Sequence, residues 1–186
     1  KYKYVFVICA STNIDRVASF HEATPRGKYF FCDSFQKDII DIARKYGEKY
    51  TQLYSFKKAL TFGKNLEEKA DKLGFCMMVR GNKRFLEIVK KYRESYNTDS
   101  LVIYSMWEGY LKLPNNTLQP LLDGFQNVTH LHTSGHATPK AIVELCKTVE
   151  PTKAIIPIHS AAPELLGGLG LPYPIEYLSD GQVYEV

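Results

Sequence analysis

The chain has 186 residues, of which 45% are hydrophobic and 24% are charged. A chain of this size and composition can bury a substantial core, which excludes a disordered or low-complexity protein. Its formal net charge of +4 is mildly basic, so it permits an RNA partner but lacks the strong positive bias that indicates nucleic-acid binding unaided.

Short runs rich in Val, Ile, Phe and Tyr alternate along the chain with helical patterns. The runs predict strands at residues 4–9, 28–32, 75–79, 100–104, 128–132 and 154–158. The first run is too short to span a membrane, so we expect no membrane partner. The pattern is weakest over residues 49–72.

Apolar residues spaced at the period of an α-helix predict helices between these strands. The stripes are Phe35, Ile39, Ile42 and Tyr46, then Phe85, Ile88, Tyr92 and Tyr96, then Leu118, Leu121, Leu122 and Phe125. Each stripe is expected to cover one face of a sheet. The alternation, with right-handed crossovers, predicts an α/β fold of three layers around a mostly parallel sheet.

The four cysteines, Cys9, Cys32, Cys76 and Cys146, lie far apart within apolar stretches and form no Cys-x-x-Cys pair. We interpret them as small buried hydrophobic side chains in a reducing compartment. A cytoplasmic location is therefore expected.

The turn after the first predicted strand, Ser11, Thr12 and Asn13, allows two interpretations. Thr12 and Asp15 have the spacing of a capping box, so Thr12 is predicted to cap the next helix. Free amides at such a helix start can instead hold a phosphate. Capping is favoured because the glycine-rich spacing of a nucleotide-binding loop is absent.

A second loop follows the predicted strand 100–104 and contains Ser105, Trp107 and Tyr110. Aromatic side chains there can stack on a base of single-stranded RNA, or they can pack on a neighbouring helix. Near the end of the predicted strand 75–79, Arg80 and Lys83 are candidates for contact with a phosphate backbone.

Histidines gather in the last third of the sequence. His132 and His136 flank a Ser134-Gly135 pair, a helix is predicted over residues 139–149, and His159 ends the predicted strand 154–158. Parallel α/β sheets place their chemistry beyond the carboxyl ends of the strands, so we expect these histidines to converge at one sheet edge. A helix beginning at Pro139 would direct backbone amides toward an anion bound in the preceding loop.

Together, the segments 105–111, 132–139 and 155–159 resemble the later half of β-CASP metallo-β-lactamase-fold hydrolases of the ribonuclease J type. The resemblance extends from Ala10 to Gln182, but the family's zinc-binding His-x-His-x-Asp-His segment does not occur in these residues. It implies a β-CASP-like α/β domain over residues 1–129. Residues 130–186 would return, as C-terminal strands and a helix, into the metallo-β-lactamase domain.

The family resemblance further implies a zinc-dependent hydrolase, specifically a ribonuclease that cleaves RNA phosphodiester bonds. His159 matches the last metal ligand, and His136 matches the catalytic histidine near the scissile phosphate, a role that suits an imidazole. The residues expected to contact substrate or phosphate are Ser134, Gly135, Ser11, Thr12, Asn13, Ser105 and Trp107. The fragment alone is expected to be inactive, with single-stranded RNA and the missing N-terminal metallo-β-lactamase half as partners.

Several alternatives stay open. After His159 the chain has Ser160 where ribonuclease J relatives commonly have a Gly-Glu pair, which counts against their recognition of RNA 5′ ends. A local zinc site could form from His130, His132 and His136, although no carboxylate accompanies them. His136 alone could be structural. The whole chain could also be a self-contained, non-catalytic nucleic-acid or nucleotide-binding α/β module, or a homo-oligomer.

Overall fold

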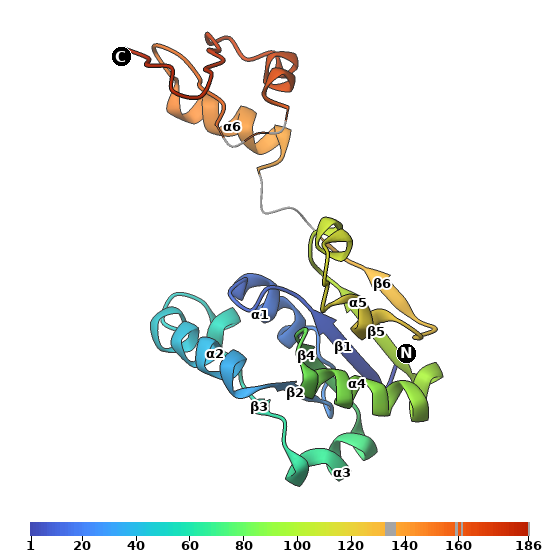
Figure 1. Cartoon of the computed structure of the whole chain (residues 1–186). Coiled ribbons are helices and arrows are strands. Elements are labelled where there is room, and N and C mark those ends of the chain that lie inside the picture. Colours follow the sequence, from blue (N-terminus) through green and yellow to red (C-terminus); the bar gives the residue numbers. More distant parts are fainter. Residues whose placement is uncertain (133–136, 159, 161, 186) are drawn as a thin grey trace. The chain divides into compact units, whose positions relative to one another are not determined.

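The structure, a computed structural model, describes residues 1–132, 137–158, 160 and 162–185. It divides the chain into two compact units, Lys1–Thr133 and Ser134–Val186 (Figure 1). His130, where the second domain is predicted to begin, pairs with Tyr104 in the sheet of the first unit. The assignment of the two units to a β-CASP and a metallo-β-lactamase domain stays a prediction.

The first unit contains a six-stranded sheet in the order β3-β2-β4-β1-β5-β6, and every neighbouring pair is parallel. The strands are β1 (Tyr4–Ile8), β2 (Tyr29–Cys32), β3 (Ala59–Thr61), β4 (Phe75–Val79), β5 (Ser100–Tyr104) and β6 (Val128–His130). The predicted α/β class with a mostly parallel sheet is confirmed.

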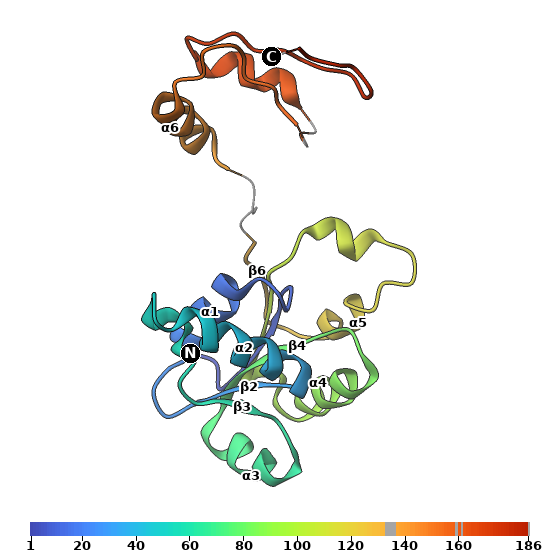
Figure 2. The same ribbon diagram turned by 90° about the vertical axis from the view of Figure 1, so that its left-hand side faces the viewer.

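Helices cover both faces of this sheet. The connecting segments are α1 (Ile14–Glu22), α2 (Ser34–Gly47), η1 (Gln52–Ser55), α3 (Lys64–Leu73), α4 (Lys83–Tyr96), η2 (Asn97–Asp99), η3 (Glu108–Lys112) and α5 (Gln119–Leu122). Residues of α1 and α2 pack with Val7 on one face, and residues of α3, α4 and α5 pack with Phe6 on the other. Because alternate residues of a strand point to opposite faces, β1 contributes to both cores, and the predicted three layers are confirmed (Figure 2).

The apolar stripe of α2 is an exception to the predicted packing. Gln36 and Ile40 are the buried residues of this helix, whereas Phe35, Ile42 and Tyr46 are exposed. The prediction that the stripe covers the sheet is therefore wrong. Asp33 caps the helix, and the side chain of Gln36 donates to the carbonyl of Ser11, which fixes the other face of the helix against the sheet.

The stripes predicted for the other two helices do reach the core. In α4, Phe85, Val89 and Tyr92 are buried, and in α5 Leu121 and Leu122 are buried in the same cluster. All four cysteines are free and buried, as predicted.

In the second unit, the predicted helix is α6 (Pro139–Val149), and η4 (Pro163–Leu169) follows it. The predicted strand 154–158 is wrong, because its described residues form only an isolated bridge between Ile155 and Ile175, and Ile158 is 82% exposed. Pro157 has no N–H to donate, so it cannot continue a ladder of hydrogen bonds. Across the described part of the chain, no helix combines the length and apolar character needed to cross a membrane.

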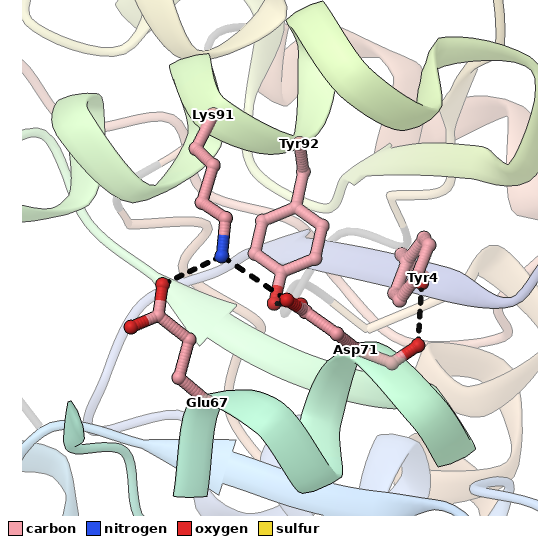
Figure 3. A network of polar contacts seen from close by, with 5 residues as sticks. All are labelled: Tyr4, Glu67, Asp71, Lys91 and Tyr92. Carbon is pink, nitrogen blue, oxygen red and sulfur yellow. Dashed lines mark hydrogen bonds and ion pairs between the residues drawn. The ribbon is translucent and has the colours of Figure 1, made fainter. Parts of the chain in front are cut away.

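A polar network joins α3 to α4 and to β1 (Figure 3). The carboxylate of Asp71 accepts hydrogen bonds from the Tyr92 hydroxyl and, at 3.2 Å, from the Lys91 ammonium, which also lies 2.6 Å from Glu67. The Tyr4 hydroxyl donates to the Asp71 carbonyl at 2.7 Å. Burial, and then the hydrogen bond to Asp71, raise the pKa of Tyr92. Tyr92 therefore remains a donor well into the alkaline range.

Candidate functional site

Strands β1, β5 and β6 end at one edge of the sheet, and their neighbouring loops form the candidate site. The chain leaves β1 toward the face covered by α1, and it leaves β5 toward the opposite face, where Met106 and Leu111 pack. When the connections that follow two adjacent parallel strands lead to opposite faces of the sheet, they leave a crevice between them. Open α/β sheets bind their ligands in this crevice.

The turn after β1 is built by Asn13. Its side chain accepts a hydrogen bond from the Arg16 amide at 3.2 Å and caps α1, so the predicted Thr12 cap is wrong. Asp15, the other half of the predicted capping box, accepts from the Tyr54 hydroxyl instead. Asn as a cap satisfies the helix amides as well as Thr would. Thr12 and Asn13 are both exposed at this edge of the sheet.

Ser105, the first residue after β5, lies between the ends of β1 and β6 and is 5% exposed. Its amide donates to the carbonyl of Ile8 at 2.8 Å, and its hydroxyl donates to the carbonyl of Leu131 at 2.5 Å. The Arg16 guanidinium donates to the Ser105 hydroxyl at 2.8 Å and to the same Leu131 carbonyl at 3.2 Å. One guanidinium therefore joins the start of α1, the end of β5 and the residue after β6.

Trp107 lies two residues further along this loop and is 61% exposed. The Trp107 ring meets the Tyr110 ring edge-on, with centroids 5.5 Å apart. Its backbone is fixed, because its carbonyl accepts from the Tyr104 hydroxyl at 3.0 Å and from the Tyr110 amide at 3.1 Å. A Cβ at Gly109 would lie 2.2 Å from the Trp107 ring, so this ring position requires glycine there. The result is a fixed aromatic surface that remains open to a ligand.

His130, the last residue of β6, lies beside the same loop. Its Nδ1 is 3.0 Å from Oε1 of Glu108, and its ring centroid is 5.3 Å from that of Tyr104. A carboxylate on Nδ1 favours the tautomer that carries the proton there and leaves Nε2 as an acceptor. Glu108 thus orients an exposed imidazole at the edge of the sheet.

Two neutral groups lie behind these residues. Burial raises the pKa of the Cys9 thiol to about 12, against a weaker opposing effect of Arg16, so this cysteine is not a nucleophile at neutral pH. Burial, with Tyr110 and Glu108, raises the pKa of Tyr104, which keeps its hydroxyl protonated and donating to Trp107.

Arg80, a predicted phosphate contact, is the first residue after β4. Its guanidinium pairs with Asp33 and lies 4.5 Å from the centre of the Phe35 ring. Its charge is thus largely offset by a nearly buried carboxylate. Lys83 lies in the first turn of α4.

Four predicted site residues, Ser134, Gly135, His136 and His159, lie outside the described residues. Among the residues that the structure does describe, no three His, Cys, Asp or Glu side chains come together as a metal site. His130 has the carboxylate of Glu108 as a neighbour, and the four cysteines are free, buried thiols. The described residues therefore do not by themselves fit a zinc ion.

Comparison with models of known protein families and with curated proteins gives no significant match for this chain. The structure places Ser11 after β1, and Ser105 and Trp107 after β5, at the same edge of the sheet. Their contact with a substrate stays a prediction. Two residues of this edge, Arg16 and Glu108, have no role in the sequence prediction. A basic residue in the first turn of a helix opposes the helix dipole, and that is a signal in the sequence by which Arg16 could have been found.

Proposed function

We propose that this chain is the substrate-binding part of a ribonuclease, and that the carboxyl edge of its sheet binds single-stranded RNA. The observation that carries the proposal is the contact of Arg16 with both Ser105 and the Leu131 carbonyl. It ties α1, the helix that follows the predicted substrate residues Ser11, Thr12 and Asn13, to the loop that contains Ser105 and Trp107.

The chemistry of the edge suits RNA. The exposed Trp107 ring offers a stacking surface for a base, and stacking of this kind contributes about 1 to 3 kcal/mol per base. Thr12 and Asn13 offer exposed hydroxyl and amide groups to the sugar or phosphate beside it. By the family resemblance, His136 would assist at the scissile phosphate in the intact enzyme, and His159 would be a zinc ligand there.

Binding is tested with a labelled single-stranded RNA and the chain itself, by fluorescence anisotropy. Trp107→Ala should weaken binding by roughly fivefold to a hundredfold, since one stacked base is lost. The matched control is Tyr50→Ala, which removes a 79% exposed aromatic ring outside the site and should leave affinity unchanged. Absence of RNA binding, or equal losses in both variants, would contradict the proposal.

A non-catalytic nucleic-acid-binding module is the second candidate. The described groups of the edge suit binding whether or not cleavage follows, since the exposed Trp107 ring offers stacking and Thr12 offers a hydroxyl. Both candidates predict RNA binding, so cleavage separates them. If the full-length protein is a nuclease, it should cleave the same RNA, and His136→Ala should lower the single-turnover rate by about 10² to 10⁴. A full-length protein that binds RNA without cleaving it is a module.

A further inference from the structure

The exposed apolar stripe of α2 points to a contact that the proposed function does not use. Phe35, Ile39, Ile42 and Tyr46 lie along one flank of the helix at successive spacings of four, three and four residues. This is the a/d spacing with which two helices pack along a common seam. The exposed fractions of Phe35, Ile42 and Tyr46 are 50%, 60% and 62%, and Ile39 is half-buried.

The other face of α2 already has its partners. Gln36 and Ile40 are buried against the sheet, and Ala43 packs on the same core. The stripe is therefore not needed to attach α2 to its own sheet, and Figure 1 shows α2 at the outside of its helical layer. Large apolar side chains at core spacing, which the first unit leaves largely exposed apart from the Arg80 guanidinium over the Phe35 ring, mark an interaction surface.

Charges beside the stripe identify the occupant. Asp38 and Lys45 each immediately precede a core position of the stripe, and both are exposed. Within α2, Lys37 and Arg44 pair with Asp41, whereas Asp38 has no ion pair among the described residues. When two such helices pack antiparallel, Asp38 of one lies across the seam from Lys45 of the other, and a two-fold axis makes this contact twice. In a parallel pair these two positions would not meet.

We infer that α2 packs antiparallel against α2 of a second copy of this chain and forms a symmetric dimer. In this arrangement Ile39 of one copy lies beside Ile42 of the other at the centre, and Phe35 lies beside Tyr46 at each end. The two Asp38–Lys45 pairs line the solvent side of the seam. The stripe is thus complementary to itself in both shape and charge.

The size of the surface predicts a weak dimer. α2 has 14 residues and is about 21 Å long. Its exposed stripe carries on the order of 300 Å² of surface per copy. Two copies then bury less than the roughly 1,200 Å² of a stable complex, so we expect a dissociation constant on the order of 10⁻⁴ M.

Sedimentation velocity and equilibrium runs on the whole chain, from about 10 μM to about 1 mM, test the dimer. The wild type should shift from monomer to dimer over this range. Ile42→Asp should remove the dimer, because it places two carboxylates in the seam. Leu145→Asp, a change at a 61% exposed apolar residue of the second unit, is the control and should leave association unchanged. Circular dichroism verifies that both variants are folded.

A charge exchange tests the antiparallel contact itself. Asp38→Lys and Lys45→Asp should each raise the dissociation constant by about tenfold, because each replaces two attractions with two repulsions. The double variant should restore the wild-type value. A chain that is monomeric at every concentration, a dimer that survives Ile42→Asp, or a double variant that is not restored would each overturn the inference. None of these outcomes depends on RNA binding.

Discussion

Removal of the Tyr92 hydroxyl isolates one contact of the network between α3 and α4. The ring of Tyr92 packs with those of Tyr4, Phe6 and Phe75 at centroid distances of 4.9, 5.6 and 5.0 Å. Phenylalanine keeps these contacts, so Tyr92→Phe removes only the hydrogen bond to Asp71. A hydrogen bond to a charged group contributes about 1.5 to 3 kcal/mol, and Asp71 keeps Lys91 as a partner. We expect a loss of about 2 kcal/mol in the free energy of unfolding at pH 7.

The same variant should change the response to alkaline pH. Burial and the Asp71 hydrogen bond raise the pKa of Tyr92 in the folded state above its unfolded value of about 10. A group with a raised folded pKa stabilises the fold fully below the unfolded pKa, and that stabilisation is lost as the pH rises above about 10. Each such tyrosine lowers the free energy of unfolding by up to about 1.4 kcal/mol per pH unit in this range. The slope above pH 10 should therefore be shallower by about that amount in Tyr92→Phe.

Urea unfolding followed by circular dichroism, at several pH values between about 7 and about 11, measures both effects. Lys91 also titrates in this range: burial lowers its pKa, but its hydrogen bonds to Glu67 and Asp71 outweigh burial and raise the pKa. Both proteins contain Lys91, so the difference between their pH slopes reports the titration of Tyr92 alone. Tyr50→Phe, at a 79% exposed tyrosine, is the control. An unchanged stability at pH 7 together with an unchanged alkaline slope would refute the described role of Asp71.

Two further predictions concern the edge of the sheet. Because Asn13 caps α1, Asn13→Ala should lower the free energy of unfolding by about 1 kcal/mol, whereas Thr12→Ala should change it by less than about 0.5 kcal/mol. Urea unfolding of both variants measures the two changes, and a larger loss in Thr12→Ala would show that Thr12 is the cap. Gly109→Ala should reduce RNA affinity as much as Trp107→Ala does, because the added Cβ displaces the Trp107 ring. An anisotropy titration measures the affinity. Undiminished affinity in a folded variant would show that RNA does not use this position of the ring.

The sheet was predictable because its central strands are long and apolar. β1, β4 and β5 each have five residues, mostly buried, and near-continuous apolar runs of this kind are typical of the interior strands of parallel sheets. β3 has only three residues, Ala59–Thr61, and is an outer strand of the sheet. Three residues are too few to show the alternation of apolar and polar side chains that indicates a strand, so the sequence does not predict β3. The run at 154–158 shows the opposite error, in which apolar composition without a partner strand does not make a strand.

The orientation of α2 was not predictable from hydrophobicity alone. The stripe of four large side chains outweighs Gln36, Ile40 and Ala43 in any count of apolar residues, yet the smaller set faces the sheet. The Gln36 amide decides this locally, because its hydrogen bond to the Ser11 carbonyl can form only with that face turned inward. Where two faces of a helix are both apolar enough to be buried, polar contacts select one, and the other remains available to a partner.

Some residues of the candidate site were predictable from the sequence, but the contacts that assemble the site were not. Ser105 and Trp107 follow a recognisable strand, so their place at the edge of the sheet could be inferred. The contacts of Arg16 could not, since they join residues separated by 89 and 115 positions in the chain. Leu131 contacts Arg16, Ser105 and Tyr104, which come from earlier elements, so the position of Leu131 depends on the fold of the first unit. A peptide that contains only the residues after β5 should therefore lack the arrangement of Arg16, Ser105 and Leu131 on which the candidate site depends.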